Sequence, residues 1–303
     1  MPSVSHTLIR GAWIHPTGTP SGEAGAEPIK DRQFVTALAR GLDILRAFQA
    51  GEGMLGNQEI AQRTGLPKPT VARLTHTLTE LGYLTYIRRF RKYELGASVL
   101  ALGYAALSNL DVRKVARPLM TQLANTVGGS VALGGRDRHS MIYLEAVRGP
   151  SVVALTHETG SRVPIAATSM GWAYLHALPE SERLALIDSM RRRRNSDWNK
   201  FKALYERAER ELNDKGFCLS WGDWMPEICG VGVPLRSPDG SAIYALNCSG
   251  PLFQVSRERL EHEWGPRLVK LARDVRNGLA ARPSHGNGHG NGNGLIQARP
   301  ARL

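Results

Sequence analysis

The sequence predicts an α+β protein of two domains, in which helices and a short hairpin precede an antiparallel sheet flanked by helices. Three observations predict this fold class. Residues 33–96 place apolar side chains at helical spacing, interrupted by the turn-forming Gly65. Beyond residue 130, short runs of strand-forming residues alternate with helical segments. The tripeptide Pro-Asp-Gly at 238–240 separates two such runs, which predicts a hairpin turn and therefore antiparallel strands.

Composition and pattern divide the chain further. Residues 1–32 are rich in glycine, proline, serine and threonine, which predicts a disordered leader without a secretory signal. Residues 282–303 contain the low-complexity run SHGNGHGNGNG and predict a flexible tail. Histidines in this tail could hold a metal loosely, but a solvated tail is the simpler interpretation. We expect a winged helix-turn-helix domain over 33–96, a linker helix over 97–110 and a mixed α+β domain over 111–281.

The bulk composition limits the class of protein. The formal net charge of +12 favours a polyanionic partner such as nucleic acid. No run approaches 18 apolar residues, so no transmembrane helix is expected. The cysteines, Cys218, Cys229 and Cys248, are odd in number and lack a CxxC spacing, which argues against a disulfide framework and against a structural zinc site. We expect a cytoplasmic protein with no bound metal and no membrane association.

A helix-turn-helix is predicted between residues 57 and 82. Asn57 is a candidate N-cap for a short first helix, and Gly65 supplies the positive φ that a tight turn between helices requires. Pro69 suits the first turn of the second helix. An apolar stripe along that second helix is expected to face inward, and it comprises Val71, Leu74, Leu78 and Leu81. An ordinary helical hairpin in a core has the same spacing, so the pattern alone leaves both interpretations open.

The opposite face of the second helix is rich in hydrogen-bond donors and has the length of a major-groove contact. Arg73 could read a guanine edge or hold a phosphate, and the sequence favours neither. The candidate DNA-binding residues of this helix are Lys68, Pro69, Thr70, Arg73, His76 and Thr77.

A basic wing follows the second helix. Residues 83–86 and 93–95 are strand-like, and the six residues between them, 87–92, hold four cations and no acid. Such a cluster repels itself unless an anion lies nearby, and a DNA backbone supplies one. A solvated basic loop is the alternative. The candidate wing contacts are Arg88, Arg89, Arg91 and Lys92. By contrast, the run Arg191–Arg194 is interpreted as a solvated helix C-terminus.

The order of these elements resembles the IclR family of bacterial transcription regulators. Residues 35–45 are similar to the family's first helix, 65–74 to its recognition helix, although Pro69 stands where serine is common, and 93–96 to the end of its wing. In the second domain the resemblance rests on 160–164 and on 245–251. It implies a winged helix-turn-helix domain, a linker helix and an effector-binding domain. It also implies a homodimer or homotetramer on a palindromic double-stranded DNA operator, controlled by a small organic effector.

The same resemblance places an effector pocket between the sheet and its loops. A helix beginning near Ser169 would offer free N–H groups to a carboxylate. Trp172 stands where the family often has lysine and Ser220 where an acid is frequent, with Trp221 and Trp224 close by. These differences favour an aromatic or apolar acid over a small aliphatic one. The expected ligand-binding residues are Val152, Leu155, Ser169, Met170, Ser220, Gly230, Asn247 and Ser249.

An enzyme acting on a small organic acid, with an attached DNA-binding domain, is the alternative from another class. The sequence contains no GxSxG, P-loop, HExxH or CxxC motif, and Gly134 and Gly135 lack the spacing of a dinucleotide loop. We therefore expect no catalytic residues and no cofactor. Cys229 and Cys248 are expected to be buried structural thiols rather than ligand contacts or redox sensors.

Overall fold

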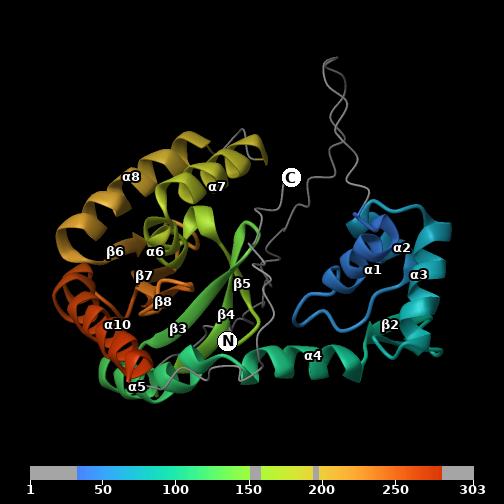
Figure 1. The fold of residues 1–303 in the computed structure, drawn as a ribbon, viewed down its shortest axis with the longest axis horizontal. Helices are drawn as coiled ribbons and strands as arrows, with labels where there is room; N and C mark the ends of the chain where they lie inside the picture. The colour runs from blue at the N-terminus through green and yellow to red at the C-terminus, as the bar shows by residue number, and fades with distance from the viewer. Residues whose placement is uncertain (1–32, 151–157, 194–197, 282–303) are drawn as a thin grey trace, which may run out of the picture.

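The computed structural model describes residues 33–150, 158–193 and 198–281, and Figure 1 shows their arrangement. The N-terminal domain consists of a helical triad followed by a two-stranded antiparallel wing. Its elements are α1 (Thr36–Arg46), α2 (Asn57–Thr64), α3 (Lys68–Glu80), β1 (Leu84–Ile87) and β2 (Lys92–Leu95). The helix-turn-helix and wing predicted from the sequence are therefore confirmed.

The core of this domain is small, and it lies where α1, α2 and α3 meet β1. Gly65 ends α2 with a φ of 69°, the left-handed conformation expected of the turn. The N-cap prediction was wrong, because Gly56 precedes the helix and its N–H donates to the Glu59 carboxylate at 2.7 Å. Leu81 was also misplaced: it follows the end of α3 and is 60% exposed, whereas Thr75 is fully buried.

Two consecutive helices connect the wing to the second domain. Helix α4 (Ala97–Ser108) contains no buried residue, whereas α5 (Asp111–Val127) buries one face against the sheet and α10. Within α5, Arg113 and Arg117 both pair with Glu145, a carboxylate that is only 2% exposed. A buried charge requires such partners, so this cluster fixes α5 to the sheet.

The second domain is built on one antiparallel sheet of six strands in the order β5-β4-β3-β8-β7-β6. Its β7–β8 hairpin confirms the turn predicted at 238–240, where Gly240 has a φ of 72°. The short strand β5 forms one edge of the sheet, and the strand-like run SVVALTHE at 151–158 lies mostly outside the described residues. The strands are β3 (Ser130–Asp137), β4 (Ser140–Arg148), β5 (Arg162–Pro164), β6 (Cys218–Trp221), β7 (Ile228–Arg236) and β8 (Ile243–Pro251).

Helices cover both faces of the sheet (Figure 1). Helices α5 and α10 (Gly265–Ala280) pack on one face, and α6 (Ser169–Ala177), α7 (Glu180–Arg193) and α8 (Trp198–Lys215) form the layer on the other. On the face that carries α5, α9, a π-helical turn and α10 follow one another without a break over residues 257–280. The smallest elements are η1 (Ile165–Ala167), α9 (Arg257–Arg259) and the π-turn η2 (Leu260–Trp264). Within the described residues, no helix combines the length and apolar character needed to cross a membrane.

Candidate nucleic-acid interface and ligand pocket

Helix α3 presents a polar and cationic face outside the core. Its inner face is held by the buried Val71 and Thr75, and the Thr75 hydroxyl donates to the Val71 carbonyl at 2.9 Å. Of the six candidates on this helix, Thr70 is half-buried and the others are exposed. No ion pair joins Lys68 or Arg73 to any other residue that the structure describes. Both cations are therefore available to an external anion.

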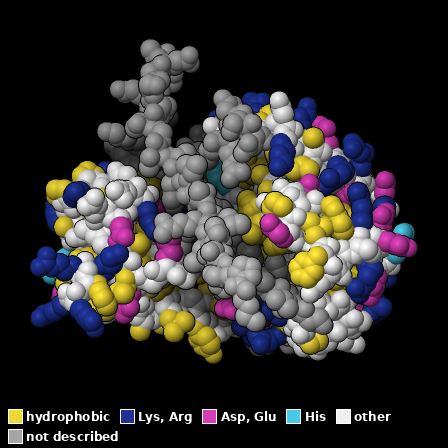
Figure 2. All heavy atoms as spheres, turned by 180° about the vertical axis from the view of Figure 1, so that it is seen from behind, with side chains coloured by type: hydrophobic (Ala, Val, Ile, Leu, Met, Phe, Trp, Pro, Cys, Tyr) yellow, Lys and Arg dark blue, Asp and Glu magenta, His cyan; other side chains and the backbone are white. Residues whose placement is uncertain are grey.

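The wing extends this cationic surface. Arg88, Arg89 and Arg91 lie in the turn between β1 and β2 and are exposed, and Figure 2 shows lysine and arginine side chains along the outer edge of the N-terminal domain. The fourth predicted wing cation differs, because the Lys92 ammonium pairs with the Glu59 carboxylate at 3.0 Å. Lys92 thus holds the wing against α2 and is less available to DNA than the three arginines.

The wing turn carries a strained residue. Arg91 has a φ of 53°, in the left-handed region that glycine and asparagine adopt more readily. The turn is closed by the Phe90 N–H, which donates to the Ile87 carbonyl at 3.1 Å, and by the Arg91 N–H to the Arg88 carbonyl at 3.3 Å. An arginine kept at a position suited to glycine is the kind of local strain found at functional sites.

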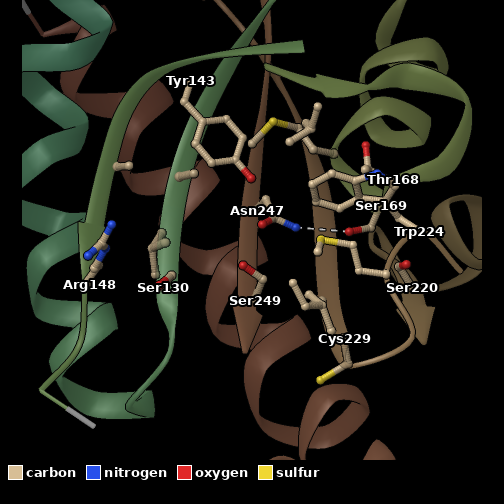
Figure 3. A pocket seen from close by; sticks show the side chains of 18 of the residues that line it. Ser130, Tyr143, Arg148, Thr168, Ser169, Ser220, Trp224, Cys229, Asn247 and Ser249 are labelled. Atoms are coloured by element: carbon tan, nitrogen blue, oxygen red, sulfur yellow. Dashed lines mark hydrogen bonds between the residues drawn. The ribbon is translucent and has the colours of Figure 1, made fainter. Parts of the chain in front are cut away.

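A pocket opens on the face of the sheet that also carries α6 (Figure 3). Two transverse rows of cross-strand neighbours lie on this face, because residues paired in register project from the same side of a sheet. The inner row consists of Ala146, Ala132, Asn247, Gly232 and Cys218. The first three line the pocket, and the last two lie beneath α6. The second row, here called the polar row, consists of Arg148, Ser130, Ser249, Gly230 and Ser220.

The start of α6 closes one side of the pocket. The Thr168 hydroxyl caps this helix by accepting from the Gly171 N–H at 3.2 Å, and it donates to the Pro164 carbonyl at 2.8 Å. Asn247 fastens the helix to the sheet, since its side-chain amide donates to the Ser169 hydroxyl at 3.0 Å. The pocket is therefore built from a rigid sheet and a well-anchored helix start.

The structure brings together most of the predicted ligand-binding residues. Six of the eight line the pocket, whereas Val152 and Leu155 lie outside the described residues. The six are Ser169, Met170, Ser220, Gly230, Asn247 and Ser249. Sequence reasoning missed further lining residues, of which Ser130, Tyr143 and Arg148 come from the neighbouring strands β3 and β4. Burial raises the pKa of the Tyr143 phenol to about 12, so it stays protonated.

The tryptophan prediction was only partly right. Trp224 lines the pocket, but Trp172 is fully buried in the core, where its Nε1–H donates to the Ala166 carbonyl at 3.1 Å. Trp221 packs against the core on the α5 and α10 side of the sheet. The pocket wall is therefore less aromatic than the sequence suggested, and its apolar part includes Met170, Met225 and Ile228.

The three cysteines are buried and unpaired. Burial raises the pKa of the Cys218 and Cys248 thiols well above the usual range and that of Cys229 to about 11. Thiols in this state carry almost no thiolate and react slowly. Cys229 borders the pocket, but its side chain packs in the core on the α5 and α10 side of the sheet, where Sγ donates to the Gly250 carbonyl at 3.4 Å. This is the buried thiol that the sequence favoured. No group of metal-ligating side chains occurs within the described parts of the chain.

An exposed cationic helix beside a basic wing, joined by helices to a second domain with a polar pocket, defines a ligand-responsive DNA-binding regulator. Comparison with known proteins leads to the same class. The helix-turn-helix domain of IclR regulators matches residues 37–88, and the bacterial transcriptional regulator IclR C-terminal domain matches residues 104–277. The chain belongs to the IclR family, whose members are transcriptional regulators rather than enzymes.

Individual relatives agree with this assignment. The HTH-type transcriptional regulator TsaQ1/TsaQ2 of Comamonas testosteroni is 36% identical over 253 residues, covering 82% of this chain and 91% of that relative. A solved IclR family regulator from Brucella abortus is 46% identical with a TM-score of 0.76, covering 84% of this chain and 96% of that one. An IclR homologue from Microbacterium hydrocarbonoxydans, solved with 4-hydroxybenzoate, shares the fold at 23% identity and a TM-score of 0.62, covering 82% of this chain and all of its own. The protein is a ligand-responsive regulator of catabolic genes.

Proposed function

We propose that the protein binds a pseudo-palindromic operator as a homodimer or homotetramer in the bacterial cytoplasm, and that an aromatic acid in the pocket alters its operator affinity. The observation that carries the proposal is the pairing of an unneutralised cationic α3 face with a wing of three exposed arginines. In this arrangement α3 of each subunit enters a major groove, and the wing contacts the adjacent backbone. Lys68, Pro69, Thr70, Arg73, His76 and Thr77 are the contacts proposed for α3, with Arg88, Arg89 and Arg91 for the wing.

Replacing the strained Arg91 with glycine should raise the stability of the N-terminal domain but lower its affinity for DNA. Arg91→Gly should raise the free energy of unfolding of the N-terminal domain by about 0.5–1 kcal/mol, because glycine adopts a positive φ freely. It should also weaken binding to operator and random DNA alike and lower the salt slope by about one. Thermal melts and salt-dependent binding curves measure both effects. Arg88→Ala is the matched control, since it removes a charge from the same turn without relieving strain. A variant that gains stability and keeps full affinity would exclude Arg91 from the interface.

Two exposed apolar surfaces support the proposed oligomer. On α1 and just before it, the exposed fractions are 61% for Val35, 63% for Leu38 and 44% for Leu42. On α4, Leu100 and Tyr104 are 75% and 71% exposed, and Figure 2 shows hydrophobic side chains along the lower edge, over this helix. Apolar residues gathered on a surface in this way mark an interaction site. We assign them to a second copy of the chain, because a palindromic operator requires a two-fold related partner.

The oligomer can be tested directly. Tyr104→Glu combined with Leu100→Glu should shift the protein towards monomer in sedimentation velocity, because charges would be buried without partners at the interface. Operator affinity should fall with it, since two half-sites are no longer held together. Leu184→Glu is the control, because Leu184 is a comparably exposed apolar residue on α7. An unchanged sedimentation coefficient in the double variant would remove α4 from the interface.

The pocket is the proposed effector site, with Ser169, Met170, Ser220, Gly230, Asn247 and Ser249 as its ligand-binding residues. Its mixture of apolar walls and a few polar groups is typical of small-molecule sites. The 4-hydroxybenzoate complex of a homologue with this fold supports an aromatic acid as occupant. Ligand binding would act on α3 through α4 and α5, which join the two domains in sequence. By linkage, operator DNA must change the affinity for the effector by the same factor.

One pair of measurements tests this function. We expect mobility shift with DNA from the protein's own upstream intergenic region to show binding far tighter than to random DNA of equal length. Addition of benzoate or 4-hydroxybenzoate should change that binding and raise the melting temperature, whereas glyoxylate should do neither. Equal affinity for both DNAs with an identical salt dependence would contradict the sequence-specific part. Stabilisation by glyoxylate alone would contradict the aromatic effector.

A further inference from the structure

The part of the pocket over β4, β3 and β8 has different hydrogen-bond chemistry at its two ends, and this difference orients the ligand. The inference rests on the proposed function, in which the pocket holds an aromatic acid. Asn247 marks one end of this part, beside the start of α6, and Arg148 marks the other, at the end of β4, whereas Ser220 and Trp224 lie beyond Asn247 (Figure 3). Strand β3 lies between β4 and β8, so two interstrand spacings, about 10 Å, separate the two strands.

The Asn247 end presents an acceptor. The side-chain NH₂ donates to the Ser169 hydroxyl at 3.0 Å and to the Val231 carbonyl at 2.9 Å. A backbone carbonyl only accepts, so the amide orientation is fixed by its partner. Figure 3 shows the amide oxygen of Asn247 on the side away from Ser169. With both N–H groups engaged, Oδ1 is the part of this nearly buried amide that a ligand can meet.

A carboxylate is poorly matched to this end. Ionised carboxylates only accept hydrogen bonds, so one placed against Asn247 Oδ1 would bring two acceptors together in a buried site. The start of α6 is also partly self-capped, because the Thr168 hydroxyl already accepts from the Gly171 N–H. A ligand hydroxyl fits better: it can donate to Asn247 Oδ1 and accept from the Ser169 hydroxyl. The start of α6 is therefore better suited to a ligand hydroxyl than to the carboxylate expected there from the sequence.

The opposite end presents donors. Ser130 Oγ is buried and has no hydrogen-bond partner among the described residues. Arg148 is its cross-strand neighbour in the polar row, and among the lining residues that the structure describes it is the only Lys or Arg. Arg148 pairs with Glu158 at 3.2 Å, but the two side chains are 43% and 77% exposed, so this ion pair is weak. The guanidinium has five N–H donors and can take a second anion.

We propose that Arg148 and Ser130 form the anion subsite of the pocket, and that the effector is an aromatic acid with a hydroxyl at the opposite end of its ring. The carboxylate contacts the Arg148 guanidinium and the Ser130 hydroxyl, and the ring lies over β3 and β8. The ligand hydroxyl donates to Asn247. Arg148 and Ser130 thus set the specificity for acids over neutral analogues, whereas Asn247 and Ser169 set the specificity for the hydroxyl group.

Calorimetric titration of the full chain tests the proposal with three probes: 4-hydroxybenzoate, benzoate and the uncharged 4-hydroxybenzamide. The wild type should bind 4-hydroxybenzoate at least about tenfold more tightly than the amide. Arg148→Gln should remove that preference by lowering the affinity for 4-hydroxybenzoate while leaving the affinity for the amide unchanged. Arg148→Lys should restore part of the preference. Ser130→Ala should lower the affinity for 4-hydroxybenzoate by a smaller factor than Arg148→Gln does. Arg267→Gln, an exposed arginine on α10, should leave all three affinities unchanged.

The results distinguish a wrong ligand orientation from a wrong effector class. If Arg148→Gln keeps the full preference for the acid, or weakens acid and amide equally, the carboxylate does not lie at Arg148 and the proposal is overturned, while the aromatic effector stands. If benzoate binds as tightly as 4-hydroxybenzoate, the hydroxyl contact at Asn247 is overturned. If the wild type binds none of the three probes, the proposed aromatic effector fails and the orientation fails with it. A melting temperature for each variant shows that it is folded.

Discussion

Arg73→Ala should lower the affinity for operator DNA by about ten- to a hundredfold, the loss that follows removal of a bidentate base contact. Arg73 is exposed near the middle of α3, pairs with no described acid and follows the half-buried Thr70 by one helical turn. It therefore projects from the face that the core leaves free. Fluorescence anisotropy on labelled operator and scrambled duplexes over a series of salt concentrations measures the effect.

The same titrations distinguish the two roles that the sequence leaves open for Arg73. A guanine contact predicts a loss on the operator with little change on scrambled DNA and an unchanged salt slope. A phosphate contact predicts similar losses on both duplexes and a slope lowered by about one. Arg276→Ala is the control, because Arg276 is an equally exposed arginine on α10, far from the helix-turn-helix in sequence. Unchanged operator affinity for Arg73→Ala would remove this residue from the interface.

The winged helix-turn-helix could be predicted because its signals are local. Gly65 and the spacing of Val71, Leu74 and Leu78 depend on neighbours within one or two helical turns, and all four take their expected places. Leu81 continues the same helical spacing in the sequence, but it follows the end of α3, where that spacing no longer defines a face. The six pocket residues that were found came from a family resemblance rather than from a pattern in the sequence.

The remainder of the pocket could not be predicted, because it depends on strand register. Ser130 and Arg148 become neighbours of each other and of Ser249 only when β4, β3 and β8 pair in one particular alignment. A slip of one residue would turn each side chain to the opposite face. The error at Trp172 has the related cause: it lies close to Ser169 along the chain, yet the turn of α6 directs it into the core.

The contact between α6 and the sheet leads to the second large prediction. Gly232 lies in the inner row beneath α6, and a Cβ at this position would overlap the backbone carbonyl of Ser169 at the start of this helix. Backbone cannot rotate away as a side chain can, so Gly232→Ala must push α6 off β7 or distort the strand. We expect a loss of about 2–3 kcal/mol in the free energy of unfolding of the second domain, the range of an overpacked core.

For a domain of this size, that loss corresponds to a fall of about 4–12 °C in melting temperature. Because Ser169 and Met170 both line the pocket, the folded variant should also bind effector more weakly at temperatures well below its melting point. Gly135→Ala is the matched control on the same sheet, since its Cβ would meet only the side chain of Leu144, at 3.2 Å. Gly135→Ala should lower both the melting temperature and the affinity for the effector by less than Gly232→Ala does. If the two variants have the same melting temperature, α6 has room to move at this contact. The pocket wall, inferred to be rigid from the Asn247–Ser169 hydrogen bond, must then adapt to its ligand.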